Sequence, residues 1–132
     1  MARYAFTGEV VSGKGEGKFF TRAEWARSAF QELVAIDPWP GTFNLRVSDR
    51  ASSAAWADLN EDPGLLLQAP DSAWCDGRCY SALLVQGNLR AAIIVPNVAS
   101  YAPDQVEIIA AVSVRETLGV GDGDRIEVEA TV

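Results

Sequence analysis

Histidine is absent from the 132 residues of this chain, and its absence removes several kinds of chemistry at once. Without imidazole there is no Ser-His-Asp or Cys-His nucleophile, no HExxH zinc site and no histidine proton shuttle. Long apolar runs are also missing: no stretch reaches the roughly 18 residues of a membrane span, and the first residues lack the apolar core of a signal peptide. We therefore expect a soluble cytoplasmic protein without a membrane partner.

Cysteine is scarce, and Cys75 and Cys79 stand four positions apart. Two thiolates alone cannot complete a four-ligand zinc site. The intervening Asp76-Gly77-Arg78 is typical of a hairpin turn, which would place the two thiols on facing strand ends. A cytoplasmic chain favours reduced, structural cysteines, and a local disulfide is the alternative.

Basic residues are outnumbered, since 11 Lys and Arg against 18 Asp and Glu give 11 − 18 = −7. Proteins that bind nucleic acid usually present positive charge to the phosphates, so this balance argues against nucleic acid as a partner. Apolar residues at 48% and charged residues at 22% are typical of a globular protein. The length predicts one domain, residues 1–132, which we expect to act as a monomer.

Hydrophobic alternation predicts a mainly β protein. In the last expected strand, alternate residues from Ile126 to Val132 face inward. Many short strands with close turns indicate a closed or nearly closed β-barrel rather than a doubly wound sheet. The expected strands cover residues 4–11, 42–47, 65–68, 80–86, 89–96, 106–110 and 125–132.

Two or three short helices accompany these strands. A capping box with Thr21 as N-cap and Glu24 as its partner predicts a helix that ends before Asp37. A second capping box, from Ser113 to Glu116, predicts a short helix closed by a glycine. Residues 48–70 form the least regular part, with one possible short helix near 54–56.

A glycine-rich loop offers the first candidate site. Gly13, Gly15 and Gly17 alternate with Lys14, Glu16 and Lys18, and the two lysines are the only ones in the chain. Alternating glycines let backbone N–H groups curl toward an anion, and the lysines add positive charge where a triphosphate would need it. The spacing fits neither Walker A nor GxGxxG, and a flexible hairpin tip with solubilising lysines is the alternative.

A second candidate lies in Pro40-Gly41-Thr42-Phe43-Asn44-Leu45. On a strand, Thr42 and Asn44 point to one face while Phe43 and Leu45 point to the other. Two oxygen donors at this spacing suit Mg²⁺, which usually takes few protein ligands and completes its shell with phosphates and water. Threonine and asparagine are also common turn residues, which is the structural alternative.

Two further candidates follow toward the C-terminus. Glu107 is a lone carboxylate inside an apolar strand, so it points either to solvent or into a pocket where it can act as a base. Ser113 to Arg115 begin a helix, whose free N–H groups suit the polar edge of a ligand. Helix capping explains the latter pattern equally well.

Taken together, these segments resemble the archaeal-type CTP-dependent riboflavin kinases. The resemblance covers nearly the whole chain and keeps the order and spacing of the family. Each motif is weak alone, and the ordered set is specific. The motifs are Gly8-Glu9-Val10-Val11-Ser12-Gly13, Gly15-Glu16-Gly17-Lys18-Phe19-Phe20, Pro40-Gly41-Thr42-Phe43-Asn44-Leu45, Ile94-Val95-Pro96, Glu107-Ile108-Ile109-Ala110, Arg115-Glu116 and Gly121-Asp122-Gly123-Asp124.

The resemblance implies a six-stranded cradle-loop barrel that transfers the γ-phosphoryl of CTP to the 5′-hydroxyl of riboflavin, giving FMN and CDP. It implies that residues 13–18 hold the nucleotide phosphates and that Thr42 and Asn44 bind Mg²⁺. It further implies that Glu107 lies at the ribityl end of the flavin and orients or deprotonates the attacking hydroxyl. The segment Val112, Ser113, Val114 and Arg115 would contact the nucleotide, including its cytosine.

Two features of the flavin-side loop depart from the family. Its flavin-side loop usually offers a threonine eight residues before the glutamate, and this chain has Ala99 there, next to Ser100. The family also often has a basic pair after the proline, where this chain has Asn97-Val98. Two alternatives to the kinase therefore stay open: a nucleotide- or flavin-binding barrel that acts as sensor or carrier, and a related kinase with another small alcohol or another nucleotide as substrate.

Overall fold

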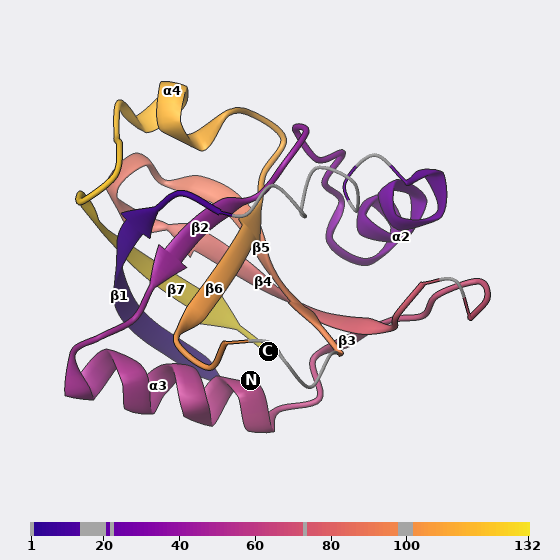
Figure 1. The fold of residues 1–132 in the computed structure, drawn as a ribbon, viewed down its shortest axis with the longest axis horizontal. Helices are drawn as coiled ribbons and strands as arrows, with labels where there is room; N and C mark the ends of the chain where they lie inside the picture. Colours follow the sequence, from indigo (N-terminus) through magenta and orange to yellow (C-terminus); the bar gives the residue numbers. More distant parts are fainter. Residues whose placement is uncertain (1, 14–20, 22, 73, 98–101) are drawn as a thin grey trace.

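Seven antiparallel strands form one sheet, and six of them close into a barrel (Figure 1). This computed structural model describes residues 2–13, 21, 23–72, 74–97 and 102–132. The sheet order is β3-β4-β5-β6-β2-β1-β7, and pairing of β4 with β7 closes the barrel, which leaves β3 as an added strand on β4. The strands are β1 (Arg3–Val11), β2 (Phe43–Arg46), β3 (Leu65–Leu67), β4 (Gly77–Leu84), β5 (Leu89–Pro96), β6 (Gln105–Ile109) and β7 (Arg125–Thr131). The predicted six-stranded barrel is confirmed.

The barrel interior holds the larger of two apolar clusters. Ile126, Val128 and Ala130 of β7 are fully buried there, as the alternation predicts, whereas Val132 is only half-buried. Inward-facing residues of the other strands, such as Phe6 and Ile108, complete the filling. The interior is therefore a packed core, and ligand chemistry belongs to the outer surface and the barrel ends.

Helix α3 (Arg50–Glu61) closes one end of the barrel and is longer than the sequence indicates (Figure 1). The Asp49 carboxylate caps it by accepting a hydrogen bond from the Ser52 N–H at 2.9 Å. Trp56 and Leu59 are buried from the helix, and the Trp56 ring lies 5.5 Å from that of Phe6. The expected short helix near 54–56 is thus wrong in extent, because small Ala and Ser residues supply half of the helix and few large apolar residues mark its buried face.

Helix α2 (Glu24–Val34) lies outside the barrel and packs on the outer face of the sheet (Figure 1). Phe30 and Val34 are buried there in the second apolar cluster, together with Ile94 of β5 and Ile109 of β6. The predicted capping box is wrong: the N-cap is Ala23, without a side-chain hydrogen bond. The buried Thr21 hydroxyl instead accepts a hydrogen bond from the Gly41 N–H at 2.8 Å, which ties the start of α2 to the turn before β2.

The expected hairpin at the cysteines is also wrong. Cys79 lies within β4, opposite Leu65 of β3 and Ile94 of β5, while Cys75 precedes the strand. The hairpin is wider and joins β3 to β4 through residues 68–76. Both thiols are free, as expected. Burial raises the pKa of the Cys79 thiol to about 11, so this group is a packing residue rather than a nucleophile.

Two short helices complete the described parts. Helix α4 (Val114–Leu118) begins at the predicted N-cap Ser113 and ends at Gly119, whose φ of 66° is the left-handed conformation that glycine adopts easily. The 3₁₀ turn η1 (Val85–Gly87) connects β4 to β5.

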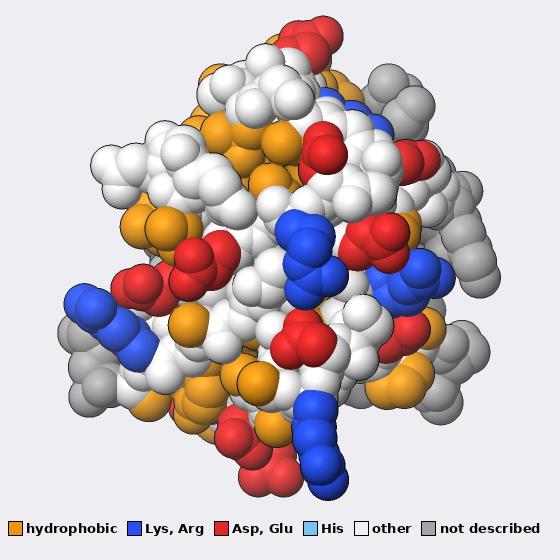
Figure 2. Space-filling model, turned by 90° about the vertical axis from the view of Figure 1, so that its left-hand side faces the viewer, with side chains coloured by type: hydrophobic (Ala, Val, Ile, Leu, Met, Phe, Trp, Pro, Cys, Tyr) orange, Lys and Arg blue, Asp and Glu red, His pale blue; other side chains and the backbone are white. Residues whose placement is uncertain are grey.

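The surface carries charges of both signs, and Figure 2 shows acidic and basic side chains close together on one face of the molecule. In the described part of the chain, no helix is long and apolar enough to cross a membrane.

Candidate functional site

A cross-strand row on the outer face of the barrel brings predicted residues together. Asn44 of β2 stands opposite Val11 of β1 on one side and Glu107 of β6 on the other. Glu107 in turn stands opposite Ile94 of β5. Directly opposed residues of antiparallel strands share a face, so Asn44 and Glu107 are neighbours. Both point away from the interior, because the adjacent Ile108 belongs to the barrel core.

Thr42 and Asn44 present two oxygen atoms side by side. The Thr42 hydroxyl donates to Asn44 Oδ1 at 3.3 Å, and Asn44 Nδ2 donates to the Thr42 carbonyl at 3.1 Å. The second bond turns the amide nitrogen toward the main chain and leaves the amide oxygen beside the hydroxyl. Asn44 is buried, so its orientation is fixed by its surroundings. This hard-oxygen pair fits a magnesium ion that takes its remaining ligands from phosphates and water.

Glu107 is half-buried and oriented by its own strand. The Gln105 side-chain amide donates to Glu107 Oε1 at 3.2 Å. The two residues lie two apart on β6 and therefore share its outer face. A carboxylate held beside Asn44 can contact a ligand that is bound at the Thr42–Asn44 oxygens. Among the residues that the structure describes, no group of three or more His, Cys, Asp or Glu forms a further metal cluster.

Gly13 brings the start of the glycine-rich loop against the same residues. A Cβ atom built on Gly13 would lie only 2.9 Å from Asn44 Cγ, so β1 leaves the barrel in direct contact with the amide. A side chain at position 13 has no room without displacing Asn44. The rest of the predicted phosphate loop, Lys14, Gly15, Glu16, Gly17 and Lys18, lies outside the described residues, as does Ala99.

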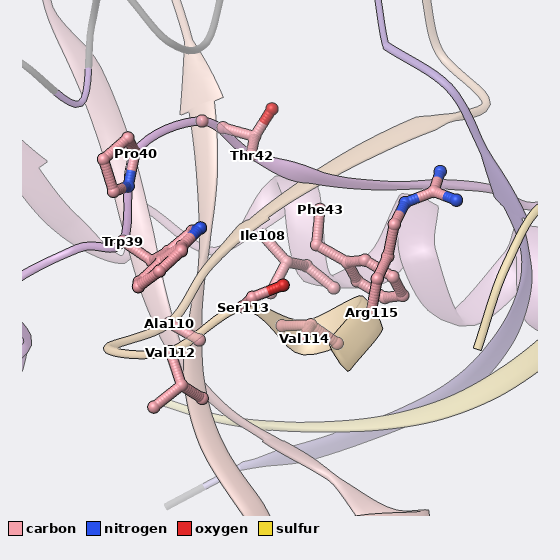
Figure 3. Close-up of a pocket in the computed structure, with 11 residues that line it drawn as sticks. Trp39, Pro40, Thr42, Phe43, Ile108, Ala110, Val112, Ser113, Val114 and Arg115 are labelled. Carbon is pink, nitrogen blue, oxygen red and sulfur yellow. The ribbon is translucent and has the colours of Figure 1, made fainter. Parts of the chain in front are cut away.

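A cavity of about 160 Å³ adjoins the oxygen pair (Figure 3). One wall is the segment from Trp39 to Phe43, and the other is the segment from Ile108 to Arg115. Thr42 lines this cavity and is hydrogen-bonded to Asn44, so one of the two predicted metal residues meets the predicted nucleotide segment there. Val112, Ser113 and Val114 also contribute, although the Val114 side chain is buried in the barrel core.

Asp122 connects several parts of this end of the site, and the sequence indicated it only as part of a motif shared with the family. Arg115 Nη2 lies 2.6 Å from Asp122 Oδ1 and 3.4 Å from the Val11 carbonyl. The Ser12 hydroxyl donates to Asp122 Oδ2 at 2.8 Å. Asp122 therefore connects the predicted nucleotide residue Arg115 to the root of the glycine-rich loop. Only the preceding resemblance marked the Gly121–Asp124 motif, and no local pattern reveals these contacts.

These contacts predict a pH dependence of stability. Hydrogen bonds from Arg115 and then Ser12 hold the pKa of the Asp122 carboxyl below its usual 3.8. A group whose pKa is depressed by folding stabilises the fold above its unfolded pKa, and that stabilisation is lost as the pH falls through the folded value. In urea unfolding, Asp122→Asn should lower the urea concentration at the midpoint at pH 7. The difference in midpoint from the unsubstituted chain should become smaller as the pH is lowered to about 2. A difference that stays constant with pH would contradict this assignment.

The fold and its surface geometry define a small β-barrel protein with a pair of side-chain oxygens, from Thr42 and Asn44, at a candidate site outside the barrel core. A family model named CTP-dep_RFKase, described as "Domain of unknown function DUF120", matches residues 10–130. The chain belongs to this family. The matched range includes Gly13, Thr42, Asn44, Glu107 and Arg115. The other residues of this set lie beside Asn44 or line the adjoining cavity.

Curated relatives extend the comparison. A riboflavin kinase of Methanosarcina barkeri is 34% identical over 125 residues, 92% of this chain and 54% of the relative. One of Pyrobaculum islandicum is 35% identical over 127 residues, 93% of this chain and 58% of the relative. One of Saccharolobus solfataricus is 31% identical over 128 residues, 95% of this chain and 73% of the relative. This chain spans little more than half the length of the first two relatives.

Proposed function

We propose that this protein is a CTP-dependent riboflavin kinase, which transfers the γ-phosphoryl of CTP to the riboflavin 5′-hydroxyl and yields FMN and CDP. The single observation that carries the proposal is the placement of the Thr42–Asn44 oxygens between Gly13 and Glu107. Phosphoryl transfer needs positioning and charge neutralisation more than covalent catalysis, so it can proceed without histidine. The family name and the names of the relatives favour the same reaction.

In this proposal each group has one task. Thr42 Oγ1 and Asn44 Oδ1 hold Mg²⁺, which when bound neutralises charge on the nucleotide phosphates. Residues 13–18 surround those phosphates, and Val112 to Arg115 contact the nucleoside. Glu107 accepts a hydrogen bond from the riboflavin 5′-hydroxyl and removes its proton as the bond to phosphorus forms. The two substrates thus meet along the row from Gly13 to Glu107.

A panel of donors tests the proposal. Purified protein is incubated with riboflavin and Mg²⁺ plus CTP or ATP, and FMN is measured by chromatography. FMN that forms with CTP and poorly with ATP is the expected result, and chelation of Mg²⁺ should abolish it. Saturable binding of CTP or riboflavin without FMN would instead favour the second candidate, a sensor or carrier barrel, which Ala99 in place of the family's threonine keeps in consideration.

Gly13→Ala should lower FMN formation by about tenfold or more, because the new methyl group would displace the Asn44 amide. Gly121→Ala is the matched control, since its Cβ would have nothing within 4 Å. Steady-state kinetics with both variants checks the expectation, with circular dichroism to verify folding. Equal activity of the two variants would mean that Asn44 does not need its present position.

A further inference from the structure

The most exposed aromatic ring of the site belongs to Trp39, which the proposed reaction leaves without a role. Its exposed fraction is 52%, whereas Trp56 is 4% exposed in the core. An indole ring that lies half in water forgoes much of the free energy that burial would supply. Trp39 lines the cavity beside Thr42, so a ligand in that cavity would cover it.

The backbone holds the ring at a defined place. Trp39 stands between Pro38 and Pro40, and a residue before proline is restricted to extended conformations. Its N–H donates to the Ala110 carbonyl at 2.8 Å, which pins it beside the segment that leads to Ser113. Because its backbone is restrained in this way, ordering the ring against a ligand costs little conformational entropy.

The other residues that line the cavity lie in a defined arrangement around the Trp39 ring. Figure 3 shows Trp39 and Arg115 on opposite sides, with Ser113 and Ile108 between them. Thr42 follows Trp39 by three residues and lies next to Asn44. A nucleotide whose phosphates lie at Thr42 and Gly13 can therefore place its base beside the indole.

We propose that the Trp39 indole is the stacking surface for the nucleobase of the phosphoryl donor, and this rests on the proposed function for the class of ligand. A base that stacks on an aromatic ring gains affinity regardless of its identity, because every base has a π-face. Trp39 therefore supplies affinity, and selection of cytosine is left to the polar groups of residues 112–115. Loss of the ring therefore lowers the binding affinity for CTP and for ATP by the same factor.

Calorimetric titration with CTP, ATP and riboflavin tests this inference on three variants. Trp39→Ala should raise the Kd of each nucleotide about tenfold or more and leave the CTP/ATP ratio and the riboflavin Kd unchanged within about twofold. Trp39→Phe keeps a stacking ring and should retain most of the nucleotide affinity. Leu66→Ala removes another exposed apolar side chain, 62% exposed on β3, and should change nothing.

Fluorescence gives a second readout. CTP should quench the tryptophan emission of the unsubstituted chain, and Trp39→Phe should lose this quenching while calorimetry still detects binding. Unchanged CTP affinity of Trp39→Ala, or a loss of riboflavin affinity in its place, would overturn the inference. If the unsubstituted chain binds no nucleotide, the inference and the proposed function both fail. The expected Trp39 results without FMN formation would support the inference and overturn the proposed function alone.

Discussion

Asn44→Ala is expected to lower riboflavin phosphorylation by about 100-fold or more while the barrel stays folded. The substitution removes Asn44 Oδ1, one of the two oxygens proposed to hold Mg²⁺, and the hydrogen bond to the Thr42 carbonyl. The backbone pairing of β2 with β1 and β6 does not use this side chain. Initial rates over a range of Mg²⁺ concentrations measure the effect, and excess Mg²⁺ should recover part of the rate.

Two substitutions of Thr42, one that removes the hydroxyl and one that keeps it, provide a matched comparison for this test. Thr42→Ala removes the hydroxyl and should resemble Asn44→Ala, whereas Thr42→Ser keeps the hydroxyl and should stay within a few-fold of the unsubstituted chain. Thermal unfolding of each variant separates a lost ligand from a lost fold. Full activity of both alanine variants would exclude this oxygen pair as the metal site, and unfolding of both would assign the two residues to structure.

Glu107→Gln should lower kcat by about 10²–10⁴-fold and leave the Kd of CTP unchanged within about twofold. Glutamine keeps the size of the side chain and can still contact Gln105, and it cannot take the proton of the 5′-hydroxyl. Glu107 lies on the far side of Asn44 from Val11 and Gly13, so nucleotide binding should not depend on its charge. Single-turnover rates with riboflavin, together with calorimetry for CTP, separate chemistry from binding.

The same replacement at an exposed site controls for the loss of one negative charge. Glu127 of β7 is exposed, and Glu127→Gln should leave both kcat and Kd unchanged. Equal losses of kcat and CTP affinity in Glu107→Gln would remove the proposed base role and leave Glu107 as a binding residue. A normal kcat would exclude any role in the transfer step.

The strands could be predicted because each carries its own pattern. Alternation in β7 identifies the buried Ile126, Val128 and Ala130 without knowledge of their partners. The Ser113 cap and Gly119 likewise mark α4 locally. The full length of helix α3 could not be predicted, because its buried face has few large side chains among alanines and serines. Thr21 has the sequence of an N-cap, yet tertiary contact with Gly41 takes its hydroxyl.

In the candidate site too, local patterns could be predicted from the sequence, whereas contacts between distant segments could not. Period-two alternation places Thr42 and Asn44 on one face, and the structure agrees. That Asn44 stands opposite Glu107 depends on the register between β2 and β6, which a single sequence does not specify. Asp122 reaches Ser12 across 110 positions of the chain, so no local motif predicts that contact. Trp39 likewise becomes a candidate only once its cavity is known.

The most direct test of the central claim follows the phosphoryl group itself. CTP labelled in its γ-phosphate is incubated with the protein, riboflavin and Mg²⁺, and labelled products are separated by chromatography. The account predicts label in FMN, with one CDP formed for each FMN. Label that stays in CTP, or appears only as inorganic phosphate while riboflavin remains unchanged, would contradict it.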